Sequence, residues 1–372
     1  MKLFLLFIIS LFPITLYADE EGSCGSNTRY TYDESTNTLN ILGEGDMSNF
    51  SMYGKDAPWY NYRTDIIKVV IKNGVSRIGN YAFCGCDRLV EVYIPNSVKS
   101  IGSDAFSACT GLTSLTIPSS VESIESYTFL ASGLVSINIE HGVKYIKASA
   151  FRGCGKLTSL ELPNSVISIG EQAFEYCTQL VNIVIPNSVT SIGGAAFHHC
   201  EKLLSIELPN SLQTIEQSTF LWCKKLSSIS IPNSIKTIGS QAFYGCENLK
   251  SISIPNGVTS IGSSAFESCS HLKEVKVYSE NPPKAYFNTF PNYNITLFVP
   301  RLSLSLYQNN SPWNNFNTIK ELEEETNIKT NRVKSEYLNK IYSLEGKKKN
   351  LLQKGVKLIH KGDGRTIKIV VK

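Results

Sequence analysis

The sequence is poor in charged residues and in metal-binding side chains. Of its 372 residues, 18% are Asp, Glu, Lys or Arg, and only five are histidines. The histidines are His141, His198, His199, His271 and His360. No histidine has a carboxylate or cysteine at a spacing that would complete a metal site. His198-His199-Cys200 invites a metal or nucleophile interpretation, but Cys200 occupies a repeated, inward-facing position described below.

Several signatures of catalysis are also missing. The sequence has no phosphate-binding loop, no nucleophile elbow and no pair of acids at a catalytic spacing. We therefore expect a protein that is not an enzyme and that holds neither a cofactor nor a metal.

Long apolar runs are absent apart from one at the N-terminus. A basic residue is followed by the apolar run Leu3–Phe12, and Leu16-Tyr17-Ala18 ends this segment. This pattern predicts a secretory signal peptide over residues 1–18, with an apolar core too short to span a membrane. A lipoprotein would need a leucine and small residues just before Cys24, and Glu21-Gly22-Ser23 do not supply them. We expect an exported protein without a transmembrane span.

What the sequence has in abundance is one repeated pattern. In Leu112–Phe129, LTSLTIPSSVESIESYTF, apolar residues stand at offsets 0, 3, 5, 9, 12 and 17. The period is 23 residues except for one step of 22, and the copies begin at Ile66, Leu89, Leu112, Leu134, Leu157, Leu180, Leu203, Leu226 and Leu249, with a truncated copy at Leu272. Each full copy closes on a phenylalanine: Phe83, Phe106, Phe129, Phe151, Phe174, Phe197, Phe220, Phe243 and Phe266. A period in this range indicates a solenoid.

Each copy predicts two short strands and a turn. The segment Leu-x-x-Leu-x-Ile has strand spacing, and the Pro-Asn-Ser that usually follows ends the strand because proline cannot donate a ladder hydrogen bond. A second extended piece, Val-x-x-Ile-Gly, precedes x-x-Ala-Phe-x-x-Cys, which we interpret as a helical turn. One coil cannot bury its apolar edge alone, so we expect a β-rich α/β solenoid of about nine stacked coils with a cap at each end.

This skeleton resembles the BspA-like leucine-rich repeat family, for example in LTSLELPNSVISIGEQAFEYC of Leu157–Cys177. The resemblance covers roughly residues 24–322. It implies a right-handed leucine-rich-repeat solenoid displayed outside the cell, typically by bacteria that live on animal hosts or by some protist parasites. Family members are regarded as adhesion and ligand-binding proteins. The resemblance therefore implies a secreted or cell-surface protein, associated with the outer membrane in a Gram-negative bacterium.

We expect six segments along the chain. The signal peptide is followed by an N-terminal cap, the repeats, a C-terminal cap, a polar linker and a tail, with bounds 19–63, 64–278, 279–322, 323–336 and 337–372. In the N-terminal cap, residues 30–32 and 39–43 predict a hairpin. Trp59 and Tyr60 either cover the open end of the first coil or form an aromatic platform for a sugar. The C-terminal cap predicts a strand over 295–299 and a helical turn over 303–307.

Two ladders of small polar residues are expected to face solvent. On the first strand the candidate ligand-face residues are Ser114, Thr116, Ser136, Asn138, Ser159, Glu161, Asn182, Ser205, Glu207, Ser228, Ser230, Ser251 and Ser253. Val184 also occupies a solvent-facing position of this ladder. The second ladder includes Ser100, Ser123, Ser168, Ser191, Thr214, Thr237 and Ser260. A flat polar face of this kind suits broad contact with a protein or a glycan. The alternative is that Ser and Thr simply tolerate exposed strand positions.

One coil departs from the pattern. Within residues 125–147, Glu and Lys replace the usual glycines, one residue is missing before Leu134, and Pro-Asn-Ser becomes Glu140-His141-Gly142. Tyr145 stands where Ser or Thr is usual, which adds it to the candidate ligand residues. Either this coil has drifted in sequence, or it is a local ligand site.

Eight of the ten cysteines follow the closing phenylalanine by three residues: Cys86, Cys109, Cys154, Cys177, Cys200, Cys223, Cys246 and Cys269. Stacked side chains that point the same way do not meet disulfide geometry, so we expect an unbridged ladder of buried thiols. Cys24 and Cys84 lie outside this register. In an exported chain they are the one candidate disulfide.

The positive charge of the chain lies in its C-terminal segment. Residues 320–372 hold 14 Lys and Arg against seven Asp and Glu. A basic tail can indicate nucleic acid or an anionic membrane, but three candidate strands, at 340–344, 355–360 and 366–372, argue against a solvated basic arm. The tail is similar to the C-terminal sorting domain of Bacteroidetes type IX secretion. It departs from that family at Lys357, where Tyr is frequent, and in a longer turn over 361–365.

Two functional classes follow. The first is an adhesin-like binding protein whose solenoid face engages a protein or glycan ligand on host or microbial surfaces, with no nucleic acid partner and with the secretion machinery as a partner of the tail. The second is a structural scaffold or spacer of the cell envelope without a ligand of its own. Loss of binding on changing ladder residues would separate the two.

Overall fold

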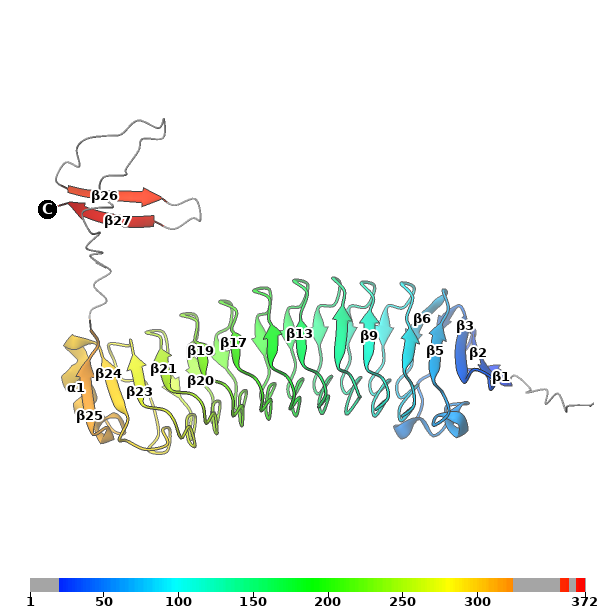
Figure 1. The fold of residues 1–372 in the computed structure, drawn as a ribbon, viewed down its shortest axis with the longest axis horizontal. Helices are drawn as coiled ribbons and strands as arrows, with labels where there is room; N and C mark the ends of the chain where they lie inside the picture. Colours follow the sequence, from blue (N-terminus) through cyan, green and yellow to red (C-terminus); the bar gives the residue numbers. More distant parts are fainter. Residues whose placement is uncertain (1–19, 324–354, 361–365, 372) are drawn as a thin grey trace, which may run out of the picture. The chain divides into compact units, whose positions relative to one another are not determined.

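The computed structural model describes residues 20–323, 355–360 and 366–371, and it divides into two compact units at Leu322/Glu323. The first unit is a solenoid of short parallel strands and turns (Figure 1). The predicted signal peptide, the linker and the first predicted tail strand lie outside these residues. Within them, no helix has the length and apolarity needed to cross a membrane.

The N-terminal cap begins with three antiparallel strands, β1 (Glu20–Ser23), β2 (Thr28–Asp33) and β3 (Thr38–Gly43). The predicted hairpin is β2–β3 and is confirmed, whereas β1 was not predicted. Strand β3 then pairs in parallel with β5 (Lys68–Ile71), so the coils start one turn earlier than the repeat pattern indicates. Two short 3-10 helices, η1 (Met52–Gly54) and η2 (Tyr60–Tyr62), complete the cap.

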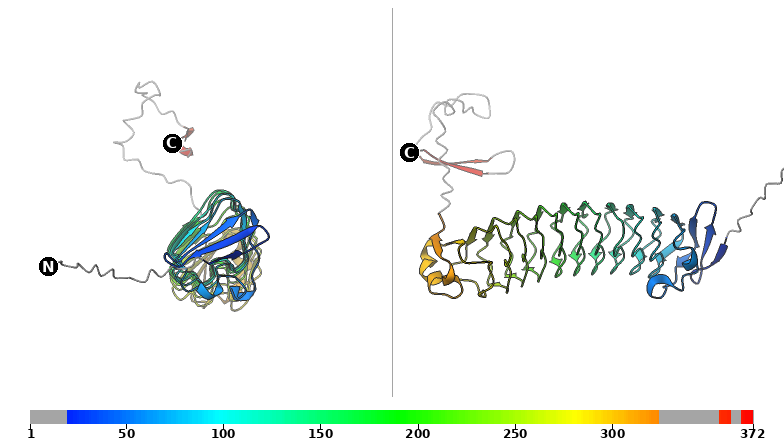
Figure 2. Two further views of the ribbon diagram at one scale, coloured as in Figure 1. Left: turned by 90° about the vertical axis from the view of Figure 1, so that its right-hand side faces the viewer. Right: turned by 60° about the horizontal axis from the view of Figure 1, so that its bottom comes forward.

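The coils up to Ile261 each contribute one strand to each of two rows of parallel strands, as the repeat predicts. The first row continues with β7 (Glu91–Tyr93), β9 (Ser114–Ile117), β11 (Ser136–Ile139), β13 (Ser159–Glu161), β15 (Asn182–Val184), β17 (Ser205–Glu207), β19 (Ser228–Ser230), β21 (Ser251–Ile254) and β23 (Glu274–Val277). The second row comprises β4 (Gly45–Asp46), β6 (Val75–Ile78), β8 (Ser100–Ile101), β10 (Ser123–Ile124), β12 (Tyr145–Ile146), β14 (Ser168–Ile169), β16 (Ser191–Ile192), β18 (Thr214–Ile215), β20 (Thr237–Ile238) and β22 (Ser260–Ile261). Equivalent residues pair, as Leu160 with Ile183, so the coils superpose when viewed along the row (Figure 2).

The third side of each coil is not helical, which corrects the prediction for x-x-Ala-Phe-x-x-Cys. Around Phe174, Gln172 and Tyr176 have φ of 57° and 60°, the left-handed region that interrupts a helix. The backbone N–H of Phe174 donates to Ala196 O (2.8 Å), and that of Tyr176 donates to His198 O (2.8 Å). These bonds to the next coil alternate with bonds inside single turns, such as that from the Glu175 N–H to Gln172 O (3.0 Å), so no helix continues.

The phenylalanines form one continuous stack through the solenoid. Adjacent rings lie 5.3–5.8 Å apart between centroids, from Phe83 to Phe266. Trp59 begins the stack on Phe83, and Phe290 extends it beyond the last predicted member. The solenoid accordingly has about eleven turns rather than the nine predicted, because both caps contribute coils.

The same stack decides between the two interpretations of Trp59. Its side chain is buried, and its indole N–H donates to Ala82 O at 2.7 Å. Trp59 therefore seals the first coil and cannot serve as a sugar platform. At the other end, Trp313 is buried against Phe290 and donates its indole N–H to Pro283 O at 2.8 Å.

The C-terminal cap contains the predicted strand and helical turn, here β24 (Thr296–Val299) and α1 (Leu304–Gln308). It also contains η3 (Arg301–Ser303), η4 (Trp313–Asn315) and β25 (Thr318–Glu321), which pairs in parallel with β24. The second unit contains β26 (Gly355–His360) and β27 (Thr366–Val371), an antiparallel pair. Two of the three predicted tail strands are thereby confirmed.

The predicted ladder of unbridged thiols is confirmed. All eight repeat cysteines are free and buried, and from Cys109 onward each Sγ donates to the backbone carbonyl of the closing phenylalanine of the preceding coil, at 3.1–3.3 Å. In the irregular coil, Ser132 takes the cysteine position and its Oγ lies 3.3 Å from the Sγ of Cys154. A small buried side chain with a hydrogen-bonding group thus occupies this position in that coil too.

The candidate disulfide between Cys24 and Cys84 is not formed in the structure, where both residues are free thiols with separate neighbours. Cys24 lies in the turn between β1 and β2, where its carbonyl accepts a bond from the Ser48 N–H at 2.7 Å. Cys84 is half-buried and lines a small hollow with Trp59 and Tyr60.

Thiol accessibility provides a direct check on this arrangement. In the folded protein we expect a thiol reagent to modify Cys84 and leave the repeat cysteines unreacted, because burial removes access and raises their thiol pKa. In denaturant, all ten cysteines should react. Rapid reaction of several repeat cysteines without denaturant would show that the coils are open.

Candidate functional site

The first row of strands presents the predicted polar ladder to solvent. Along most of these strands, inward apolar and outward polar residues alternate, as in β13, where Leu160 is buried between exposed Ser159 and Glu161. All thirteen first-strand candidates are exposed and lie on this one surface, which we call the strand face. In-register pairing aligns them across coils, as Ser114 with Ser136 and Thr116 with Asn138.

The second ladder differs from its prediction. Ser191 is exposed, but Ser100, Ser123, Ser168, Thr214, Thr237 and Ser260 are half-buried. The strands there are two residues long and turns flank both ends, so neighbouring chain covers part of each hydroxyl. Tyr145 belongs to this row, between Ser123 and Ser168, and is half-buried. It does not lie with the other candidates.

The strand face is hollowed where β7, β9 and β11 meet. A hollow of about 590 Å³ is lined by Ser114, Thr116, Ser136 and Asn138 together with Val90, Tyr93 and Glu140. Two smaller hollows of about 300 and 260 Å³ continue along β11–β17, past Glu161, Val184 and Glu207. We call these three hollows the strand-face groove.

The groove also exposes apolar side chains, of which the sequence analysis placed Val184 on the solvent-facing ladder and missed Tyr93 and Val90. Tyr93 is 56% exposed, Val90 52% and Val184 48%. Val90 directly follows the first leucine of its repeat, and that position holds Val or Leu in several coils, including Val135 and Leu204. The recurrence of apolar residues at this position was the feature of the sequence that could have identified Val90. Mixed apolar and hydrogen-bonding surface in a concavity is typical of a binding site.

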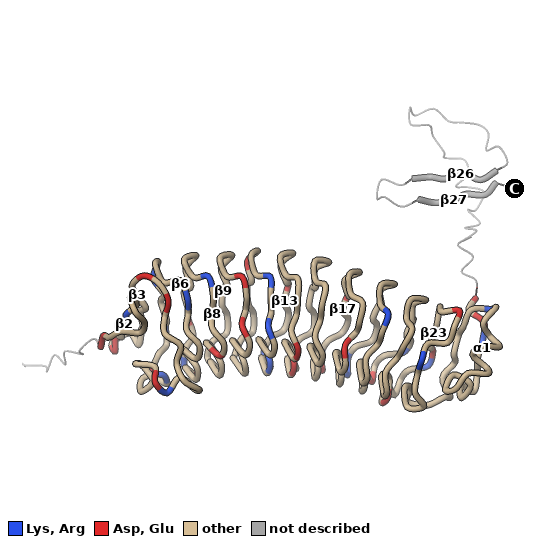
Figure 3. Tube along the Cα trace, turned by 180° about the vertical axis from the view of Figure 1, so that it is seen from behind, with Lys and Arg blue, Asp and Glu red and all other residues tan. Residues whose placement is uncertain are grey.

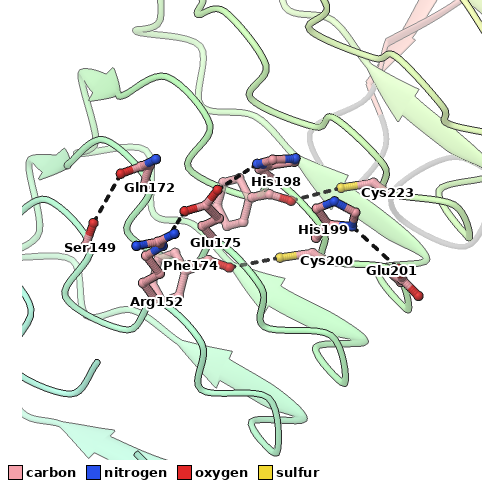
Figure 4. Close-up of polar contacts among 11 residues, drawn as sticks. Ser149, Arg152, Gln172, Phe174, Glu175, His198, His199, Cys200, Glu201 and Cys223 are labelled. Carbon is pink, nitrogen blue, oxygen red and sulfur yellow. Dashed lines mark hydrogen bonds and ion pairs between the residues drawn. The ribbon is translucent and has the colours of Figure 1, made fainter. Parts of the chain in front are cut away.

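The His198-His199-Cys200 segment does not form a reactive site (Figure 4). Buried Glu175 lies between Arg152 (Nε to Oε2, 2.5 Å, an ion pair without hydrogen-bond geometry) and His198 (Nδ1 to Oε1, 2.7 Å). Cys200 points inward and donates to Phe174 O at 3.3 Å, away from both imidazoles. Burial raises the pKa of the Cys200 thiol, so it is not a nucleophile at neutral pH.

The neighbouring imidazole, that of His199, also contacts a side chain of its own coil. Burial and nearby His198 lower the pKa of His199, whose Nδ1 lies 3.5 Å from Glu201 Oε1. Over the part of the chain that the structure describes, no three His, Cys, Asp or Glu side chains are grouped to hold a metal ion.

The irregular coil keeps its place in the stack. Ile146 pairs with Ile124 on one side and Ile169 on the other. Its unusual residues contact their neighbours: Lys144 Nζ lies 2.9 Å from Glu122 Oε1, and Lys147 lies over the Tyr145 ring at 4.8 Å. These contacts favour sequence drift with local compensation around residues 144–147, whereas Ser136, Asn138 and Glu140 of the same coil line the large hollow of the groove.

Comparison with protein families identifies the family of this solenoid. The family model described as "BspA type Leucine rich repeat region (6 copies)" matches residues 58–181 and 167–296. The chain belongs to the BspA-type leucine-rich repeat family. No functionally curated protein matches it.

Among solved structures, this BspA-type protein is similar to a leucine-rich repeat protein from Eubacterium ventriosum, with 22% sequence identity and a TM-score of 0.47. The match covers 82% of this chain and 85% of that chain. It is also similar to the leucine-rich repeat protein of T. pallidum (24% identity, 65% and 86% covered, TM-score 0.38). A third is the pneumococcal vaccine antigen PcpA (16% identity, 82% and 99% covered, TM-score 0.41).

Proposed function

We propose that this BspA-type protein is a non-enzymatic, adhesin-like binding protein, secreted or held at the cell surface, that engages a protein or glycan of a host or microbial surface. The observation that carries the proposal is the strand-face groove, which combines a concavity with exposed Tyr93 and aligned Ser, Thr and Asn side chains. The ladder residues that line the groove are the proposed ligand contacts: Ser114, Thr116, Ser136, Asn138, Glu161, Asn182, Ser205 and Glu207. The stacked coils hold them in fixed register, which reduces the ordering cost of binding.

A matched pair of variants tests the groove. Thr116 lies in the large hollow and Ser253 lies outside all three hollows, and both are exposed at the same position of their strands. We expect Thr116→Arg to weaken saturable binding to an immobilised matrix protein or arrayed glycan by about tenfold or more, because the side chain fills the hollow. Ser253→Arg adds the same charge and should leave binding unchanged.

Equal binding by both variants and the wild type would remove the groove from the proposal. A folded protein without any saturable ligand would favour the scaffold function instead.

We further propose that residues 337–372 direct export as a type IX sorting domain after residues 1–18 act as a signal peptide. The antiparallel pair β26–β27 and the resemblance of the tail support this. In a bacterium with that secretion system, deleting residues 337–372 should leave the solenoid inside the envelope while its circular dichroism stays unchanged. Normal surface display of the truncated chain would contradict the sorting function.

A further inference from the structure

The strand-face groove carries charge of one sign. Its lining includes four carboxylates, those of Glu91, Glu140, Glu161 and Glu207, and it includes no Lys, Arg or His. Charged residues are sparse along the rest of the coils, as the mostly tan trace of Figure 3 shows. The lysines that precede these strands, Lys156 and Lys202, are not part of the lining.

Two of the four carboxylates already have partners. Glu91 pairs with Lys68 at 2.8 Å, and Glu140 accepts the backbone N–H of Ser119 at 2.9 Å. Glu161 and Glu207 are exposed and form no ion pair within residues 20–323. The negative potential of the groove is therefore concentrated at these two side chains, and a concave surface strengthens it.

The spacing of the two free carboxylates is fixed by the coils. Glu161 pairs with Val184 across β13–β15, and the Leu204 N–H bonds Val181 O to join the coil that contains Glu207. Two strand spacings separate the carboxylates by about 10 Å. Exposed Val184 lies between them, and Asn182 and Ser205 provide hydrogen-bonding groups beside it. The basic residues of the strand face lie outside the groove lining: Lys68 in β5, which pairs with Glu91, Lys276 in β23 and Lys320 in β25.

We propose that the ligand of the groove is an extended protein segment with Lys or Arg at every third residue, lying along the solenoid. In a polyproline II segment, residues i and i+3 share one side and lie about 9 Å apart, which matches the spacing of Glu161 and Glu207. Apolar side chains between the cations would contact Val184. Sulfated and carboxylated glycans are repelled by the same charges. This inference rests on the proposed function of the strand face and identifies its ligand class.

A synthetic peptide of repeating Arg-Pro-Val triplets is the probe, with Gln-Pro-Val and Glu-Pro-Val peptides as matched controls. We expect saturable binding of the Arg peptide to residues 19–372, weakened about tenfold by the double variant Glu161→Gln/Glu207→Gln. The double variant Glu171→Gln/Glu216→Gln removes the same charge from exposed carboxylates of the same two coils, outside the groove lining. It should bind the Arg peptide as the wild type does. Raising the salt from about 50 to about 500 mM should weaken binding.

Three results would overturn the inference: absence of binding by the Arg peptide, equal loss in both double variants, or tighter binding of the Gln or Glu peptide. If Thr116→Arg abolishes binding of a glycan or neutral ligand and Glu161→Gln/Glu207→Gln does not change that binding, this inference is overturned and the proposed function stands. A ligand unaffected by either change would contradict both.

Discussion

Raising the pH from neutral to about 10 is expected to lower the free energy of unfolding by on the order of 10 kcal/mol. The eight repeat thiols are buried, and burial raises their pKa, to about 12 for Cys154 and Cys269. In the unfolded chain a cysteine ionises near pH 8.5. Above that pH the unfolded state loses protons that the folded state retains, so the stability present at lower pH is lost as pH rises. Each thiol contributes about 1.4 kcal/mol per pH unit.

Urea unfolding followed by circular dichroism at several pH values measures this loss. Cys200→Ser should reduce the change in unfolding free energy with pH by about the contribution of one thiol, because serine does not ionise in this range. Serine already occupies the equivalent position of the irregular coil at Ser132. Tyr307, whose burial also raises its pKa, contributes in the same direction and stays constant in this comparison. An unfolding free energy that is constant between pH 8 and 10 would contradict the burial of the thiol ladder.

Phe197→Ala is expected to lower the free energy of unfolding by about 3–5 kcal/mol. The ring is fully buried and stacks on Phe174 at 5.5 Å and on Phe220 at 5.6 Å. Its removal leaves a cavity between two coils in the middle of the array. Because stability in a solenoid comes mainly from contacts between adjacent coils, unfolding should also become less cooperative.

The matched control for this substitution is Phe287→Ala, since Phe287 lies in the C-terminal cap with 79% of its surface exposed. Its change in unfolding free energy should stay within about 0.5 kcal/mol. Urea denaturation of the three proteins compares them. A loss below about 1 kcal/mol for Phe197→Ala would mean that the stack does not hold the coils together.

The repeat determined most of the fold, because a 23-residue period fixes which residues are stacked and which face inward. It could not reveal the left-handed residues beside each phenylalanine, because residues such as Tyr176 and Ala195 are not of types that favour that conformation. Phe290 was missed because the pattern around it is interrupted, although it continues the stack. Strand β1 has no apolar alternation to mark it.

The candidate site was predicted in part. Alternation along the first strand identified its exposed residues, since one side of each strand must be buried. The same argument was wrong for the second ladder, where two-residue strands leave the hydroxyls half-covered by turns. The groove depends on how side chains such as Tyr93 and Glu140 stand beside neighbouring coils, and a one-dimensional pattern does not contain that information.

Hydroxyl-radical footprinting would test the binding function of the strand face most directly. Tyr93 in the groove and Tyr278 outside it are both exposed, at 56% and 43%, and both are readily oxidised in the free protein. With saturating ligand, we expect oxidation of Tyr93 to fall severalfold while that of Tyr278 stays constant. Unchanged oxidation of Tyr93 together with protection elsewhere on the solenoid would contradict the account.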